Sequence, residues 1–263
     1  MDAYIRLGIF LGVFIGLALA EYIWPRRKQI LEISKRWPNN IGIALINVLL
    51  VRFCLPITLA GFSVVVSDNH WGFLSMTDLP LIVKIILSLI LLDLVIYGQH
   101  VAFHHVPVLW RLHRVHHADT EIDVTTALRF HPIEIVVSMG IKFAAVAAIG
   151  APAEAVLLFE IILNACAMFN HGNIYLPPEI DRALRCILVT PDMHRVHHST
   201  ITRETNSNYG FNIPLWDRLF RTYRAQPELG HKDMTIGLRE FREPGEARID
   251  RILTQPFRQP AKK

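Results

Sequence analysis

Three apolar blocks, at residues 7–24, 41–66 and 79–98, are each long enough to cross a lipid bilayer. A transmembrane helix needs about 20 apolar residues to cover the hydrocarbon core. Over the whole chain 52% of the residues are hydrophobic and only 19% are charged, whereas soluble domains carry about 25% charged residues. The blocks therefore predict an all-α integral membrane protein with three spanning helices.

Two shorter apolar blocks, at 133–150 and 153–169, meet at the sequence Gly150-Ala151-Pro152. Glycine commonly ends a helix and proline commonly begins one, so these blocks predict a helical hairpin. Arg52 and Lys142 interrupt the apolar pattern, and a charge at the bilayer centre costs about 2.5–3.5 kcal/mol. Either these side chains snorkel, or their segments are shallow or broken, and Pro56 would break the second block.

The first block also has a signal-peptide interpretation, because Ala18-Leu19-Ala20 resembles a cleavage site. Signal peptides concentrate positive charge in front of the apolar stretch. Here Asp2 accompanies Arg6 in front, and the basic run 26–28 follows the block. A retained helix is the favoured prediction.

Basic residues at 26–28, 35 and 36 are expected on the cytoplasmic side of the membrane. The second and third spans then cross outward and back, and residues from about 100 onward return to the cytoplasmic side. The hairpin also enters and returns. All the clustered histidines are therefore expected at the cytoplasmic face.

The chain has 13 histidines, and the string His-Arg-Val-His-His occurs twice, at 113–117 and 194–198. Helical geometry places residues i, i+3 and i+4 on one face. The spacing predicts three groups, each on one helical face: His100 and His104; His113, His116 and His117; His194, His197 and His198.

A single histidine is usually buried, hydrogen-bonded and inert, but eight grouped histidines are harder to bury. Packing them together would leave polar atoms unpaired or charges in repulsion. Metal ions satisfy neutral imidazoles, because each donates a lone pair. Eight ligands exceed the four of zinc and the six of octahedral ions, so the pattern predicts two metals.

Two further histidines are candidate ligands. His131 precedes Pro132 at a predicted helix start, and His171 lies where the hairpin returns to the same surface. With the eight above, they complete a predicted set of ten. His70 and His231 are distant in the sequence, and His105 points away from His104, so none of these three is included.

The three histidine boxes, H-x3-H followed by two H-x2-H-H, resemble the fatty acid hydroxylase superfamily, also called the sterol desaturase family. The flanking sequences "LWRLHRVHHAD", "DVTTALRFHPIE", "NHGNI" and "TNSNYGFNIPLWDRLF" are similar as well. The resemblance covers residues 85 to 223. Two positions depart from the family: Val101 replaces the usual Arg after the first box histidine, and Phe220-Arg221-Thr222 replaces the common Phe-Gly-Thr.

The resemblance implies an oxygenase with two iron ions (Fe2+/Fe3+) at the cytoplasmic face. Such an enzyme uses O2 to hydroxylate or desaturate C–H bonds of lipids such as sterols, fatty acyl chains or alkylglycerols. From the residues alone, imidazole ligands suit iron, zinc, copper and nickel alike. Asp93 is a candidate to orient a ligand imidazole, or is simply a polar residue near a span end. Asn208 is a candidate to contact the site through water.

The sequence predicts N-terminal membrane helices in 1–78, a catalytic region in 79–225 and a loosely structured tail in 226–263. The expected partners are a membrane lipid and a separate electron-donor protein, because no haem-binding motif is present. Dispersed basic residues argue against nucleic acid. A histidine-rich metal transporter or sensor, or a zinc-dependent lipid hydrolase, is the alternative. Histidines outside the spans disfavour transport, and the lack of a Glu beside either triplet disfavours hydrolysis.

Overall fold

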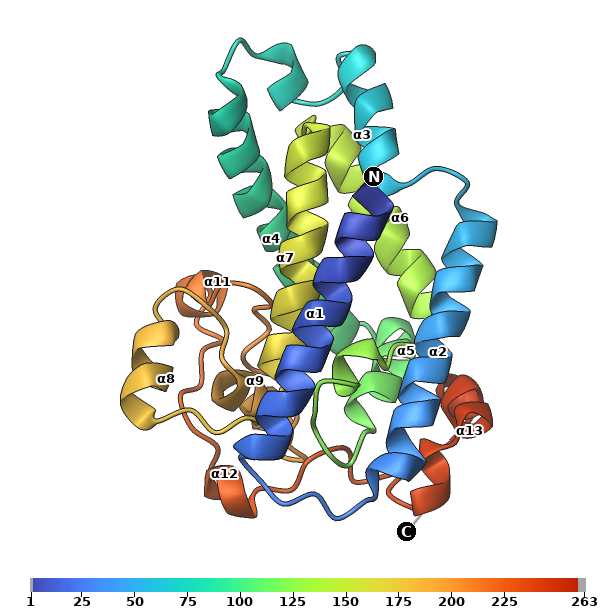
Figure 1. Cartoon of the computed structure of the whole chain (residues 1–263), viewed down its shortest axis with the longest axis vertical. Helices are drawn as coiled ribbons and strands as arrows, with labels where there is room; N and C mark the ends of the chain where they lie inside the picture. Colours follow the sequence, from blue (N-terminus) through green and yellow to red (C-terminus); the bar gives the residue numbers. More distant parts are fainter. Residues whose placement is uncertain (1, 260–263) are drawn as a thin grey trace.

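The computed structural model describes residues 2–259, and all its regular secondary structure is helical. Long helices stand side by side in the upper part of Figure 1, and short helices gather around their lower ends. Over the described residues, extended pairing is limited to two isolated bridges, Pro25 with Ile174 and Ser199 with Ile236. The predicted all-α fold is confirmed.

The long helices form a bundle, which is the membrane part of the protein. A cap at one end of this bundle is made of residues 106–131 and 172–259. The bundle contains α1 (Asp2–Ile23), α2 (Ile33–Cys54), α3 (Leu59–Asp68), η1 (Leu74–Met76), α4 (Leu81–His105), α6 (Pro132–Ile149) and α7 (Ala153–His171). The cap contains α5 (Pro107–His117), η2 (Thr126–Leu128), α8 (Pro178–Leu184), α9 (Pro191–His197), α10 (Thr202–Thr205), α11 (Leu215–Leu219), α12 (Gly230–Asp233), η3 (Pro244–Ala247), α13 (Ile249–Thr254) and η4 (Gln255–Phe257).

Five segments are long and apolar enough to cross a membrane: α1, α2 together with α3, α4, α6 and α7. They correspond to the three spans and the hairpin expected from the sequence, so the chain is an integral membrane protein. The second span is broken where Pro56 was expected to break it. Helix α2 ends at Cys54, and α3 starts after Thr58, whose side chain accepts a hydrogen bond from the Gly61 backbone NH at 3.0 Å.

The hairpin between α6 and α7 turns at Gly150, which has a left-handed φ of 71°. Glycine adopts this conformation without the steric cost that a Cβ imposes. The loop after α3 lies tightly on this turn, because a Cβ on Gly72 would collide with the backbone of Gly150. The predicted helical hairpin is confirmed, and its turn is held by direct backbone contact.

A buried ionic network fastens the start of α2 to the segment that follows α5. Arg36 is fully buried and donates hydrogen bonds to both carboxylate oxygens of Asp119, at 2.8 and 2.7 Å, and to Asp123. Burial alone would raise the pKa of Asp119, but the Arg36 guanidinium lowers it to about 2. The pair is therefore charged at neutral pH, and it fixes the chain directly behind the first histidine triplet.

The expectation of a loosely structured tail is wrong for residues 226–259. Ile252 of α13 is completely buried against Ile43 of α2 and Val115 of α5. Arg114 donates hydrogen bonds to the backbone oxygens of Gln255 and Arg258, at 2.6 and 2.7 Å. The composition of this segment is mainly polar, so the sequence does not indicate that a few apolar residues attach it to the rest of the protein. The last predicted tail residues, 260–263, lie outside the described part of the chain.

Candidate metal centre

Nine buried histidines form two groups, and within each group one ring nitrogen from every member lies within 4.8 Å of the others. The first group contains His100, His104, His113, His117 and His197, and the second group contains His116, His171, His194 and His198. The groups adjoin, since the ring centroids of His117 and His198 are 4.6 Å apart. The structure therefore brings together nine of the ten predicted ligands.

The two short helices α5 and α9 each contribute to both groups. On α5, His113 and His117 belong to the first group and His116 to the second. The second triplet has the opposite division. His197 of α9 belongs to the first group, whereas His194 of α9 and His198, directly after this helix, belong to the second group. The sequence predicted three nitrogens on one face of each helix. Each triplet is instead divided between the groups. At 3.6 residues per turn, residues i and i+4 point within about 40° of each other, whereas i+3 points about 60° from i on the other side.

Hydrogen bonds at Nδ1 orient four of the five rings in the first group. The acceptors are Tyr209 O for His100 (2.8 Å), Asn206 Oδ1 for His104 (3.3 Å), Glu134 Oε1 for His113 (2.6 Å) and Ser207 O for His197 (2.7 Å). A proton held on Nδ1 leaves the lone pair on Nε2. The Nε2 atoms of these four rings have no hydrogen-bond partner among the described residues.

In the second group, ring nitrogens face one another without an oxygen acceptor between them. His171 donates from Nδ1 to Ala167 O at 2.7 Å, so its Nε2 carries a lone pair. That Nε2 lies 3.0 Å from Nε2 of His116 and 3.1 Å from Nε2 of His194. A shared cation would convert these close nitrogen contacts into ligand bonds.

Burial keeps the cap histidines neutral. It lowers the pKa of His113 to about 3 and, with the neighbouring rings, lowers the pKa of His117 and His197 well below the usual value. Neutral imidazoles have the free lone pair that a metal requires. Buried nitrogens without a partner are costly, so the residues present fit two metal ions. By geometry each group could hold a metal ion, and the all-nitrogen donor set is compatible with several transition metals.

The loop before α11 holds two rings of the first group through its backbone. Ser207 and Tyr209 supply the carbonyls for His197 and His100, and Asn208 between them has a left-handed φ of 53°. The Asn208 amide donates to the backbone oxygens of Met193 (2.9 Å) and of Arg224. The sequence predicts that Asn208 reaches the metals through water, whereas the structure uses its side chain to fix this loop.

Asp93 was also expected to act on an imidazole. Its carboxylate accepts hydrogen bonds from the Asn212 amide at 2.7 Å and the Trp216 indole at 2.8 Å. These partners follow Tyr209 in the chain, and Tyr209 holds His100 through its carbonyl. Asp93 therefore supports the loop that orients a ligand, and its hydrogen bonds go to that loop rather than to a histidine.

His131 lies in neither group, so the structure does not bring it to the other predicted ligands. Its Nδ1 accepts a hydrogen bond from the Ile133 backbone NH at the start of α6, and its Nε2 lies 3.1 Å from Leu253 O. Both nitrogens are thus engaged by the backbone. Of the three histidines left out of the predicted set, none belongs to either group.

Sequence reasoning missed Glu134, which is buried and holds Nδ1 of His113 at 2.6 Å. In the sequence it serves only as a helix-start signal, since it stands in the first turn of α6. Its position three residues after the candidate ligand His131 and at the end of a predicted apolar helix could have marked it as a carboxylate partner for an imidazole.

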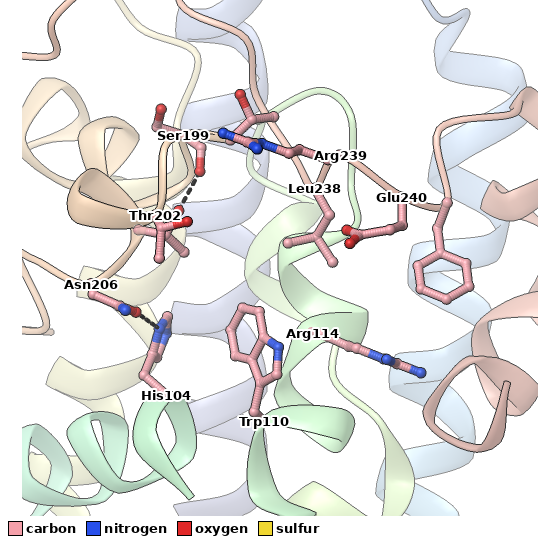
Figure 2. A pocket seen from close by; sticks show the side chains of 12 residues that line it. His104, Trp110, Arg114, Ser199, Thr202, Asn206, Leu238, Arg239 and Glu240 are labelled. Atoms are coloured by element: carbon pink, nitrogen blue, oxygen red, sulfur yellow. Dashed lines mark hydrogen bonds between the residues drawn. The ribbon is translucent and has the colours of Figure 1, made fainter. Parts of the chain in front are cut away.

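Two cavities reach the first group. A cavity of about 1040 Å³ opens within the bundle and is lined by His100 and His113 as well as by apolar side chains such as Ile96 and Phe103. A cavity of about 480 Å³ lies in the cap, where Figure 2 shows Trp110 between His104 and Arg114. The site is therefore accessible both from the membrane part and from the cap.

Residues 85–222 match the fatty acid hydroxylase family, and this stretch is more than half of the chain and contains all nine grouped histidines. The chain belongs to the fatty acid hydroxylase family. It is thus a membrane lipid hydroxylase, an oxidoreductase, and neither the transporter nor the hydrolase alternative agrees with this membership.

The chain is similar to the ornithine lipid hydroxylase OlsE of Rhizobium tropici, with 29% identity over 87% of this chain and 70% of that protein. The alkylglycerol monooxygenase of Homo sapiens is 28% identical over 50% of this chain and 28% of its own length. The fatty acid hydroxylase vlmA of Lecanicillium sp is 32% identical over 57% of this chain and 44% of that protein. No solved structure matches the chain significantly.

The two departures from the family pattern leave the histidines untouched. Val101 packs beside Tyr97 and Tyr209 in an apolar cluster. Arg221 has a left-handed φ of 60°, which explains why glycine is common at this position, because a Cβ costs about 1–2 kcal/mol there. The adjacent Thr222 keeps its structural role, since its hydroxyl donates to Asp217 at 2.7 Å.

Proposed function

We propose that this chain is a di-iron monooxygenase that hydroxylates a C–H bond of a polar membrane lipid with O2. The observation that carries the proposal is the pair of adjoining groups of neutral, buried imidazoles in a chain of this family. The first group would hold one iron and the second group the other. When bound, the iron pair supplies the redox chemistry that puts one oxygen atom of O2 into the C–H bond and reduces the other to water.

The protein's own residues position and shield the reaction. The bundle cavity admits a lipid from the bilayer, and apolar side chains of its lining next to the histidines, such as Ile96 and Phe103, limit the access of water to the site. Because His100 and His113 line this cavity, a lipid bound in it would have its reacting carbon next to the first group. Their ring orientations are fixed by Tyr209 and Glu134. Such preorganisation places the substrate carbon close to the reacting centre.

Hydroxylation is proposed rather than desaturation because the relatives carry the names hydroxylase and monooxygenase. Ornithine lipids and alkylglycerols, which appear in those names, both have a polar end. A lipid with a polar end is therefore the proposed substrate class.

To test the reaction, the purified metal-loaded protein is incubated with a bacterial lipid extract, a reductant and ¹⁸O2. We expect a lipid hydroxyl that carries ¹⁸O and forms only when oxygen and electrons are both present. The measurement is mass spectrometry of the lipids. The same yield of hydroxylated lipid under anaerobic conditions would contradict the oxygenase proposal.

We further propose that the cap and the metal centre face the cytoplasm. The support is that the basic segment after α1 is bound to the cap: Arg26 donates to Asp192 at 3.0 Å, and Arg27 donates to Met234 O at 2.7 Å. Basic residues next to a span favour the cytoplasmic side. A topology reporter fused after residue 120 or after residue 200 is therefore expected to be active in the cytoplasm. A signal from the opposite side with either fusion would overturn this orientation.

The electron donor is proposed to be a separate protein that docks on the cap. The supporting feature is Trp110, which lines the cap cavity and whose ring centroid lies 5.0 Å from that of His104 and 5.5 Å from that of His117. The indole and His104 itself thus connect the cavity to the first group. A donor bound at the cap should protect the rim residues Arg239 and Glu240 from hydrogen exchange, and unchanged exchange there would count against this docking site.

A further inference from the structure

The wall of the bundle cavity carries charged side chains of both signs. Its lining includes three basic and three acidic residues: Arg6, Arg52, Lys142, Glu134, Glu154 and Glu160. A charge inside a membrane protein is costly unless it is paired or serves a ligand. The charges of this cavity therefore indicate what can occupy it.

One pair of these charges cancels, and Glu134 is engaged by His113 at 2.6 Å. Arg6 Nη2 lies 3.1 Å from Glu160 Oε2, which forms an ion pair. Among the side chains that the structure describes, neither Lys142 nor Arg52 has an acidic partner within 4.0 Å. Glu154 is exposed in the first turn of α7. The cavity thus presents two unpaired cations to its occupant.

Helix α6 places Lys142 in line with the metal centre. Glu134, Ser138 and Lys142 are four residues apart, share one helical face and all line the cavity. At a rise of 1.5 Å per residue, Lys142 lies about 12 Å along the helix from Glu134, which holds His113. Because side chains of a helix lean toward its N-terminus, the ammonium group lies nearer to the site than this distance.

The wall between these two points is polar. The Gln99 amide donates from Nε2 to Ser138 Oγ at 3.0 Å, and its buried Oε1 has no partner among the described residues. The second carboxylate oxygen of Glu134 is also buried without a partner. Unsatisfied acceptors on this stretch favour a hydrogen-bond donor of the substrate, such as a hydroxyl or an amide NH, between its charged end and the histidines.

We propose that Lys142 binds an anionic group of the lipid substrate, a carboxylate or a phosphate, and thereby selects the carbon that reacts. The inference rests on the proposed function, which makes this cavity the substrate site. Lys142 lies about 12 Å along α6 from Glu134, so the anionic group is placed at about this separation from the first histidine group. The reacting carbon is therefore set by this separation from the polar end of the lipid, and the rest of the acyl chain extends toward the bilayer.

The test measures binding to the full-length protein in nanodiscs, without reductant. Two probe pairs are used: N-palmitoylglycine with its methyl ester, and phosphatidic acid with diacylglycerol. Hydrogen bonds to charged groups predict a preference of about tenfold or more for the anionic member of one pair. A preference within the first pair identifies a carboxylate, and a preference within the second identifies a phosphate. Equal binding of both members in both pairs overturns the proposal.

Variants separate Lys142 from general electrostatics. Lys142→Met should abolish the preference, and Lys142→Arg should keep most of it. Lys84→Met is the matched control, because Lys84 lies on α4 outside the cavity lining and donates to Thr77 O at 2.8 Å. An unchanged preference in Lys142→Met overturns the proposal. If Lys142→Met does not fold, two other measurements test the proposal. One is the wild-type probe comparison, and the other is Lys142→Glu, which should reverse the preference toward a cationic probe lipid.

Binding and turnover give separate answers. Because the binding assay needs neither O2 nor electrons, a lipid preference that depends on Lys142 supports the anion subsite even if no hydroxylation is detected. Conversely, hydroxylation by a protein that binds charged and neutral probes equally overturns the subsite and leaves the proposed reaction in place.

Discussion

Replacing His113 or His117 with alanine should reduce the bound metal of the purified protein from two ions per chain to about one or fewer, as each variant removes a buried ligand nitrogen. Both residues belong to the first group, and no other described group occupies their Nε2 atoms. His194→Ala and His198→Ala should have the same effect through the second group. Metal content is measured by inductively coupled plasma mass spectrometry after gel filtration.

Three other histidines serve as matched controls in the same experiment. His70, His131 and His231 lie in neither group, so their alanine variants should keep the wild-type metal content. His131 is the most informative, because its sequence position predicts a ligand and its hydrogen bonds in the structure do not. If His131→Ala lost as much metal as His113→Ala, the division into two groups of five and four would be wrong.

Much of this centre could be predicted from the sequence because its determinants are local. A spacing of three and four residues fixes directions along one helix, and α4, α5 and α9 keep that spacing. The spacing does not encode how two helices cross. Hence the division of each triplet between two groups, with His116 and His197 each separated from its two neighbours, became visible only in the structure.

The predictions that failed depend on distant segments. The ring of His131 is engaged by Leu253, which is 122 positions away, and no local pattern announces such a contact. The same segment was expected to be loose because its composition is polar, although buried Ile252 fastens it to α2 and α5. In both cases tertiary packing decided the outcome, and composition along the chain carried no information about it.

Replacing Glu134 with alanine should weaken metal binding at the first group by about 10- to 100-fold, the range for residues that orient a ligand histidine. Glu134 accepts the Nδ1 proton of His113 at 2.6 Å. Without this acceptor the ring can rotate or exchange its proton between nitrogens, so its Nε2 lone pair no longer points reliably at the metal. The measurement is a competition titration with a chelator that reports affinity independently of turnover.

The conservative variant Glu134→Gln separates orientation from charge, because its amide oxygen can still accept the proton from His113. We expect Glu134→Gln to retain most of the metal affinity that Glu134→Ala loses. Glu154→Ala is the control, since Glu154 also lines the bundle cavity but is exposed at the start of α7. Equal losses in Glu134→Gln and Glu134→Ala would show that the negative charge, and not the hydrogen bond, matters to the centre. Wild-type affinity in Glu134→Ala would contradict the positioning role, and His113 would then be held by packing alone.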